Sequence, residues 1–129
     1  MHVVAALIWD DGRLLSVCRG YGKLKGFWEF PGGKVEEGES LKSALVREIY
    51  EELAAEISIE KHLLTHHHIT NDVQLKIDCF LCTLQSSFSL LEHSSYAWLS
   101  NDDFLSINWL EADVNILKKI LSEDLIDFN

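Results

Sequence analysis

One predicted helix, from Ser40 to Ala54, constrains the fold of this chain more than any other segment. The stretch is rich in leucine, alanine, glutamate and arginine, and Ser40 can cap its first turn. Leucine and isoleucine side chains form one apolar arc on a helical wheel: Leu41, Leu45, Ile49 and Leu53. That arc must face a hydrophobic core.

Carboxylates interrupt this apolar arc. Glu52 falls inside it, Glu48 lies at its edge, and Glu51 lies a little beyond. A buried carboxylate without a partner is costly, and neighbouring carboxylates repel one another. Arg47 can neutralise only part of the cluster, whereas Mg²⁺ suits hard oxygen ligands and can compensate the rest. The helical spacing predicts that the three glutamates converge on such an ion; the alternative is an ordinary solvated helix face.

The rest of the chain alternates between strand-like and helical stretches. Strands are expected at His2–Trp9, Arg13–Arg19, Phe27–Phe30, Glu56–Thr70, Val73–Leu84 and Tyr96–Leu99. Turns are expected at Asp10-Asp11-Gly12, Pro31-Gly32-Gly33 and Asn71-Asp72, a helical turn at Ser100–Phe104, and a closing amphipathic helix at Glu111–Leu121. No repeat or linker is visible, so residues 1–129 are predicted to form one domain, an α/β or α+β sandwich.

Composition excludes several classes of function. The formal net charge of −10 argues against long nucleic acid as a ligand, because such ligands require a basic surface. A small phosphorylated molecule remains compatible if a metal ion supplies positive charge. No apolar run is long enough to cross a membrane, and Met1–Trp9 lacks the basic region of a signal peptide, so a cytoplasmic location is expected.

The cysteines and histidines give no metal or disulfide signal. The chain has 3 cysteines, an odd number that argues against a disulfide framework. Cys79 and Cys82 lie in an expected strand, where residues three apart point to opposite faces, so buried free thiols are expected. The same alternation prevents His66-His67-His68 from converging on one ion, although one of them can line a cleft.

The spacing of charged residues around the helix resembles the signature of the Nudix hydrolase family. Gly33 is followed after five residues by Glu39, and after seven more by Arg47-Glu48-Ile49-Tyr50-Glu51-Glu52. Ala54 and Ala55 stand where the family has glycine and an aliphatic residue. The preceding Trp28–Lys34, with the sequence WEFPGGK, is similar to the MutT-type branch, whose members are named 8-oxo-dGTP diphosphatases or CTP pyrophosphohydrolases.

This resemblance implies a Nudix αβα sandwich, with a mixed β-sheet between helices. It implies Mg²⁺-dependent hydrolysis of a nucleoside triphosphate to a nucleoside monophosphate and pyrophosphate, with Mn²⁺ expected to substitute. Metal ions neutralise phosphate oxygens and lower the pKa of the attacking water. Oxidised guanine and cytosine-type nucleotides both remain open as substrates, and the protein is expected to be a monomer or a homodimer.

The family also assigns roles to individual residues by position. The metal ligands are expected to be the Gly32 carbonyl, Glu48, Glu51, Glu52 and Glu92. Glu48 is also the expected general base, oriented by Arg47, while Gly33 and Glu39 are structural, with Glu39 tying the loop to the helix. Glu92 is an alternative base, and an ordinary loop carboxylate is an equally good interpretation.

Substrate contacts are expected outside the helix, at Arg19, Glu29, Phe30, Pro31, Lys34 and Asp113. Arg19, which ends an expected strand facing the cleft, is the preferred phosphate contact, with Lys34 and Lys23 as further cations; for each of them an ordinary surface cation is an equally good interpretation. Asp113 lies where the MutT-type branch places a base-reading residue. An ionised aspartate can accept from the amino group of cytosine, and a protonated one can donate to an oxidised purine. Alternatively, Asp113 only favours the N-terminus of a helix through the helix dipole.

Two other functions stay open. One is a Nudix hydrolase of another nucleoside diphosphate derivative, such as a nucleotide sugar or a dinucleoside polyphosphate. The other is a non-catalytic nucleotide sensor, which the intact Arg47-Glu48 and Glu51-Glu52 pairs argue against.

Overall fold

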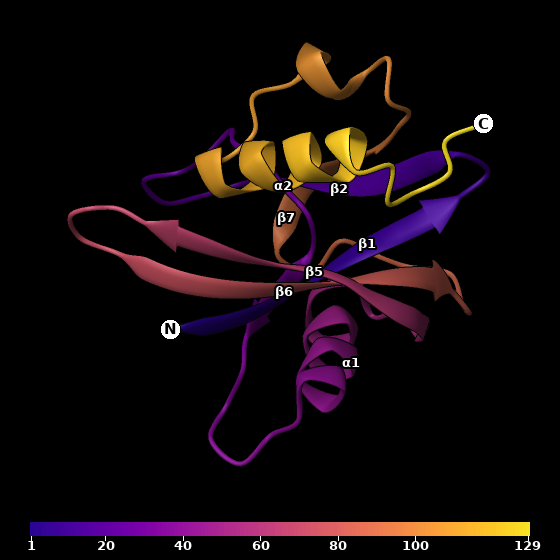
Figure 1. Cartoon of the computed structure of the whole chain (residues 1–129). Coiled ribbons are helices and arrows are strands. Elements are labelled where there is room, and N and C mark those ends of the chain that lie inside the picture. The colour runs from indigo at the N-terminus through magenta and orange to yellow at the C-terminus, as the bar shows by residue number, and fades with distance from the viewer.

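The computed structural model describes all residues 1–129 and has two α-helices on opposite sides of a twisted sheet (Figure 1). The strands are β1 (His2–Asp10), β2 (Arg13–Arg19), β3 (Trp28–Glu29), β4 (Gly32–Lys34), β5 (Ile57–Ile69), β6 (Gln74–Leu84) and β7 (His93–Leu99). The helices are α1 (Leu41–Leu53), a 3₁₀ turn at Phe104–Ser106, and α2 (Glu111–Ser122). The predicted sandwich of a mixed sheet between helices is confirmed.

Strand β1 joins the two halves of the sheet. The strand order is β3-β2-β1-β6-β5, with β4 also paired to β1 and β7 to β2. The β1–β6 pair is parallel and the others are antiparallel. Because Val4 pairs with Gly33, the short β4 strand is fixed beside the start of β1. The chain then passes directly from β4 into the loop that precedes α1.

Each helix covers its own hydrophobic core. The core under α1 includes Leu45, Ile49 and Leu53, and the core under α2 includes Ile116 and Ile120. Successive strand residues alternate between these two cores, as expected for β-structure. The predicted separation of the two cysteines of β6 is confirmed, because Cys79 belongs to the α2 core and Cys82 to the α1 core, and all 3 cysteines are free.

Several local predictions differ from the structure. The expected turn at Pro31–Gly33 overlaps the strand β4, which begins at Gly32 and ends at Lys34. This strand forms by pairing with β1, so the local sequence gives no signal for it. A side chain at Gly32 would collide with the Val4 carbonyl, so glycine allows this close approach. Strand β7 begins at His93 and not at Tyr96. The turn expected at Ser100–Phe104 is present, because the Asp103 amide donates to the Ser100 carbonyl at 3.0 Å, and a 3₁₀ turn follows at Phe104–Ser106.

Both ends of α1 are defined by local geometry. The Ser40 side chain accepts a hydrogen bond from the Ser43 amide, so the predicted cap is present. The helix ends at Leu53, and Ala54 adopts the left-handed conformation with φ 49°. Neither α1 nor α2 has the length and apolar character that crossing a membrane requires.

Candidate active site

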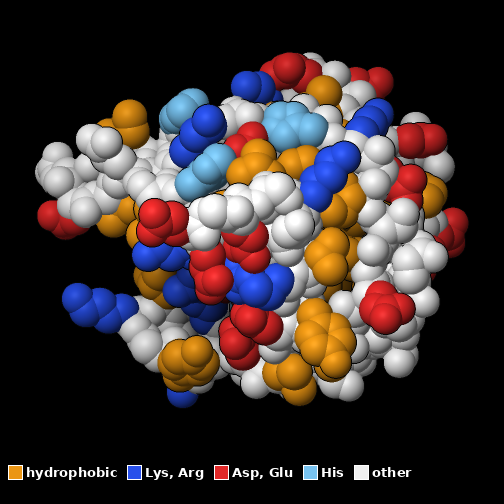
Figure 2. All heavy atoms as spheres, turned by 90° about the horizontal axis from the view of Figure 1, so that it is seen from below, with side chains coloured by type: hydrophobic (Ala, Val, Ile, Leu, Met, Phe, Trp, Pro, Cys, Tyr) orange, Lys and Arg blue, Asp and Glu red, His pale blue; other side chains and the backbone are white.

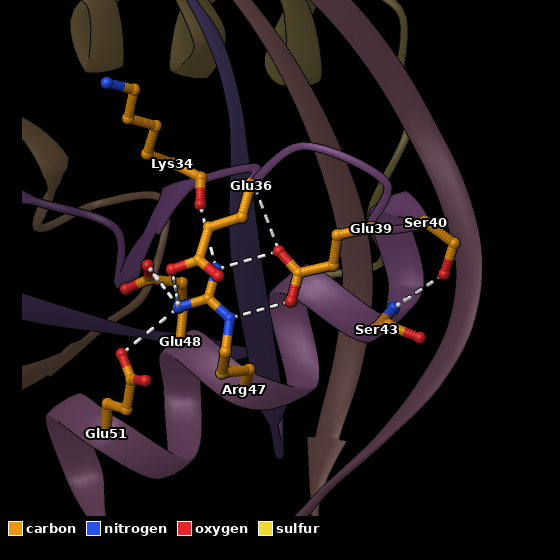
Figure 3. A network of polar contacts seen from close by, with 8 residues as sticks. All are labelled: Lys34, Glu36, Glu39, Ser40, Ser43, Arg47, Glu48 and Glu51. Carbon is orange, nitrogen blue, oxygen red and sulfur yellow. Dashed lines mark hydrogen bonds and ion pairs between the residues drawn. The ribbon is translucent and has the colours of Figure 1, made fainter.

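Arg47 connects α1 to the loop that precedes it (Figure 3). Its Nε and Nη2 donate to the two carboxylate oxygens of Glu39 at 2.7 and 2.9 Å, and Nη2 also donates to the Lys34 carbonyl at 3.0 Å. Glu39 in turn accepts from the Glu36 amide at 3.0 Å. The hydrogen bonds from Arg47 and from that amide lower the pKa of Glu39 to about 2. Glu39 therefore ties the loop to the helix while ionised.

The same guanidinium also holds two glutamates of α1. Its Nη1 donates to Glu48 at 3.0 Å and to Glu51 at 3.2 Å. The Glu48 side chain is mostly buried, and its carboxyl fills the space that a side chain at position 33 would occupy, so Gly33 leaves room for it. Burial raises the pKa of Glu48 above its usual value, although Arg47 opposes the shift. Arg47 thus lies where it can orient Glu48.

Glu52 is the buried carboxylate of α1. It is 8% exposed, and its Oε2 accepts from the Gly32 amide at 3.1 Å. Burial raises the pKa of Glu52 to about 9, and the carboxylates of Glu29, Glu48 and Glu92 add repulsion. The burial predicted from the helical wheel is therefore confirmed, and ionisation at neutral pH requires a nearby positive charge.

A cavity of about 190 Å³, here named the acidic cavity, lies beside Glu52. It is lined by Arg19, Gly20, Tyr21, Glu29, Glu52, Glu92 and His93. Glutamates from β3, from α1 and from the segment before β7 meet at its wall. Seen from the α1 side, acidic and basic side chains also crowd together on the molecular surface (Figure 2).

The expected convergence of Glu48, Glu51 and Glu52 on one point is not present in the structure. Glu48 and the half-exposed Glu51 turn toward Arg47, whereas Glu52 bonds to the Gly32 amide. No group of acidic or histidine side chains forms a complete metal-binding arrangement. Repulsion between the carboxylates favours these separate contacts. The oxygen donors and the raised pKa of Glu52 nevertheless fit a hard divalent cation, so the ligand roles stay predictions.

A second cavity of about 290 Å³, here named the slot, adjoins the first and shares Arg19, Glu29 and Glu52 with it. Apolar side chains from distant segments line it: Val3, Phe30, Leu75, Ile77, Leu110 and Ile116. The Phe30 ring packs on Trp109 with centroids 5.0 Å apart. The Lys34 side chain lines the slot and points away from Arg47 (Figure 3). An apolar slot with few polar groups suits a flat ring such as a nucleobase.

Asp113 supplies a carboxyl group to the slot. It lies in the first turn of α2, is 8% exposed, and accepts from the Phe30 amide at 3.2 Å. Burial raises its pKa to about 7, with added repulsion from Glu29. Both protonation states are therefore accessible near neutral pH.

Arg19 and Glu29 form an ion pair at the junction of the two cavities. Arg19 Nε and Nη2 donate to the two oxygens of Glu29 at 2.9 and 3.0 Å. Burial alone would raise the pKa of Glu29, but hydrogen bonds from His93 and Arg19 outweigh it and the net pKa is lowered. Glu29 thus fixes the orientation of the Arg19 guanidinium, and the N–H groups that do not bond to Glu29 can donate to an anion.

Some predicted site residues are not brought to the cavities. Pro31 is fully buried and lines neither the slot nor the acidic cavity, because its carbonyl accepts from the Ala6 amide within the sheet. Lys23 is exposed on the loop after β2, and the run His66–His68 on β5 also lines neither cavity. In contrast, His93 lines the acidic cavity, and no spacing in the sequence had indicated it.

Comparisons with known proteins show the family to which this chain is related. The model of the NUDIX domain matches residues 1–121. The CTP pyrophosphohydrolase of Escherichia coli K12 is 33% identical over 128 residues, covering 95% of this chain and 92% of that protein. The 8-oxo-dGTP diphosphatase of Proteus vulgaris is 34% identical over 85 residues, covering 64% of this chain and 76% of that protein.

Solved structures share the overall fold of this chain. The solution structure of the E. coli ORF135 protein has a TM-score of 0.84 at 30% identity, covering 95% of this chain and 89% of that one. The MutT Nudix hydrolase of Burkholderia pseudomallei has a TM-score of 0.81 at 28% identity, covering 92% and 96%. The chain belongs to the Nudix hydrolase family, which confirms the resemblance seen in its sequence.

Proposed function

We propose that this protein is a Mg²⁺-dependent nucleoside triphosphate pyrophosphohydrolase that releases a nucleoside monophosphate and pyrophosphate. The observation that carries the proposal is the junction of the acidic cavity with the slot through Arg19, Glu29 and Glu52. A triphosphate in the acidic cavity would place its base in the adjoining slot. The proposed role is sanitation of the cytoplasmic nucleotide pool.

The side chains of the site divide the chemistry between them. When bound, Mg²⁺ neutralises phosphate charge and activates water, and Glu52, Glu51, Glu48, Glu92 and the Gly32 carbonyl are the groups that would hold it. Glu48 is the proposed proton acceptor, because its raised pKa favours uptake of the proton and Arg47 fixes its orientation. Arg19, at the junction of the two cavities, and Lys34, on the wall of the slot, are the cations proposed to contact phosphate oxygens.

The base is proposed to be either cytosine or oxidised guanine. Phe30 and the neighbouring aliphatic side chains would sandwich the ring, while Asp113 would read a polar edge. One relative is named CTP pyrophosphohydrolase and another 8-oxo-dGTP diphosphatase, so each name supports one of the two candidates. The protonation state of Asp113 would decide between the two bases. The ionised carboxylate only accepts hydrogen bonds and suits the amino group of cytosine, whereas the protonated carboxyl can donate to oxidised guanine.

A substrate panel tests the proposal. Purified protein with Mg²⁺ would be given dCTP, CTP, 5-methyl-dCTP, 8-oxo-dGTP and ADP-ribose, and pyrophosphate and nucleoside monophosphate would be quantified. We expect one of the triphosphates to be the best substrate by kcat/KM. Preference for ADP-ribose would overturn the triphosphate assignment. Binding of nucleotides without turnover of any compound would favour a sensor.

A further inference from the structure

His93, the first residue of β7, is a buried polar side chain without an assigned role. Its side chain is 6% exposed, and its Nε2 lies 3.1 Å from Glu29 Oε2 at the wall of the acidic cavity. A carboxylate oxygen can only accept, so Nε2 carries the proton and donates it to Glu29. The other ring nitrogen, Nδ1, is buried without a hydrogen-bond partner. The hydrogen bond to Glu29 is therefore the single polar contact of the His93 ring.

A β-bulge determines which way His93 points. In the β2–β7 ladder Cys18 pairs with Ser95, but the next residue, Arg19, pairs with His93, so Ser94 is an extra residue. In a regular ladder Arg19 would face Ser94, and His93 would point to the opposite face of the sheet. Bulges of this kind redirect side chains and are frequent next to active sites.

The neighbouring strand completes the group on the same face. Val17 pairs with Glu29 in the β2–β3 ladder, so their side chains share one face of the sheet. Arg19, two residues beyond Val17, points to that face as well. The bulge thus brings a third side chain, His93, to the ion pair of Arg19 and Glu29.

Glu29 needs this additional donor because its surroundings are acidic. Glu29, Glu52 and Glu92 line the same cavity, and the first two repel one another. The guanidinium of Arg19 is less buried than Glu29, with side-chain exposures of 41% and 18%. The orientation of the arginine is therefore set by the more buried carboxylate, and the donor from His93 helps to hold that carboxylate in place.

We propose that His93 is a positioning residue that holds Glu29 and, through it, aims Arg19 at the phosphate chain of the substrate. The inference rests on the proposed function, because a phosphate is the group that Arg19 would then contact. It predicts a loss of substrate affinity when the donor is removed. It also predicts that any side chain placing an N–H near the same point restores that affinity.

The test compares His93→Ala with His93→Gln, whose amide can replace the imidazole Nε2 donor. With dCTP and Mg²⁺, the alanine variant should raise KM about tenfold, the scale of one charge-assisted hydrogen bond, and leave kcat within about twofold. The glutamine variant should return KM to within about twofold of the wild type. Ser95→Ala, on the same strand but outside the cavity, is the control and should change neither constant.

The outcomes separate this inference from the proposed function. An unchanged KM in His93→Ala, or a glutamine variant as impaired as the alanine variant, would overturn the positioning role. If the wild type hydrolyses no triphosphate, the proposed function fails. Calorimetric binding of dCTP carrying an α,β-imido bridge then tests His93 by itself, since weaker binding to the alanine variant with recovery in the glutamine variant supports the role. Equal binding by all three proteins would refute it.

Discussion

At the scale of single residues, two buried acids on opposite helices serve the two cavities. Glu52 of α1 lies at the acidic cavity, and Asp113 of α2 faces the slot. Burial raises the pKa of Glu52 to about 9 and that of Asp113 to about 7. The first value indicates a group that needs a cation before it ionises at neutral pH. The second indicates a carboxyl group that changes protonation close to neutral pH, so that a small shift in pH converts it from a hydrogen-bond donor to an acceptor.

Base preference is predicted to depend on pH through Asp113. As pH rises through about 7 the carboxyl ionises, so the ratio of kcat/KM for dCTP over 8-oxo-dGTP should increase. The Asp113→Asn variant should give a flat ratio from about pH 5.5 to about pH 8.5. Parallel kinetics on both substrates measure this. Equal losses on both substrates, with no change in the ratio, would indicate that Asp113 has only a structural role.

The same pKa has a consequence for stability. The folded-state pKa of Asp113 is raised, so the folded protein favours the protonated carboxyl. Its contribution to the free energy of unfolding is therefore complete below the unfolded pKa of 3.8 and is lost as pH rises through about 7. Over that window the asparagine variant should therefore gain stability relative to the wild type. Urea unfolding at several pH values is the control for the kinetic comparison.

At the scale of elements, the C-terminus of α1 carries a strained residue. Ala54 is exposed and adopts φ 49°, a left-handed conformation that favours glycine. Ala54→Gly should raise the free energy of unfolding by about 1 kcal/mol and leave kcat unchanged. Ala55→Gly is a matched control, because Ala55 is buried in the α1 core and its replacement should be destabilising. Denaturant unfolding of both variants measures the difference.

The elements that could be predicted from sequence are those with local signals. The cap at Ser40 and the apolar arc of α1 define that helix, and the burial of Glu52 follows from the same periodicity. Strand β4 and the bulge at Ser94 could not be predicted, because each depends on pairing with a strand distant in sequence. The place of His93 beside Glu29 was missed for this reason.

The slot also could not be predicted from the sequence, because it too depends on segments that are distant in the chain. Its walls come from β1, from β6, from the segment around Phe30 and from α2, so its shape depends on the sheet order. The resemblance indicated Phe30 and Asp113 by position. The aliphatic residues Leu75 and Leu110 look like ordinary core positions in the sequence. The exclusion of Pro31 from the slot also required the β1–β4 pairing, which buries it.

At the scale of the whole molecule, a polar cluster joins three strands on the face of the sheet that α1 covers. Asp78 of β6 accepts from His2 of β1 at 2.6 Å, from His62 of β5 at 2.7 Å, and from Thr65 of β5 at 2.6 Å. Asp78 is 4% exposed, and histidine side chains are visible together on this side of the molecule (Figure 2). The cluster fixes β1 against the β5–β6 hairpin, and β1 in turn positions β4.

This cluster predicts a loss of stability in acid. Burial would raise the pKa of Asp78, but hydrogen bonds from Thr65, His2 and His62 outweigh it and lower the pKa to about 2. The stability it contributes is present above the unfolded value of 3.8 and is lost as pH falls through about 2. Asp78→Asn should cost about 2 kcal/mol at neutral pH and flatten the acid limb of the unfolding curve. An acid limb unchanged by the substitution would show that Asp78 does not stabilise the folded protein through its ionised form.

Carboxylates on the core-facing side of α1 are proposed to support a cation-dependent hydrolysis. Release of pyrophosphate from the best triphosphate would be measured for the wild type and for Glu52→Gln, each with Mg²⁺ and with excess EDTA. The wild type with Mg²⁺ should release pyrophosphate and monophosphate in equal amounts, and neither protein should turn over the substrate in EDTA. The glutamine variant with Mg²⁺ should lose at least about a hundredfold in kcat while folding as stably as the wild type. Near-normal turnover by Glu52→Gln, or turnover in EDTA, would show that these carboxylates do not act through a bound cation.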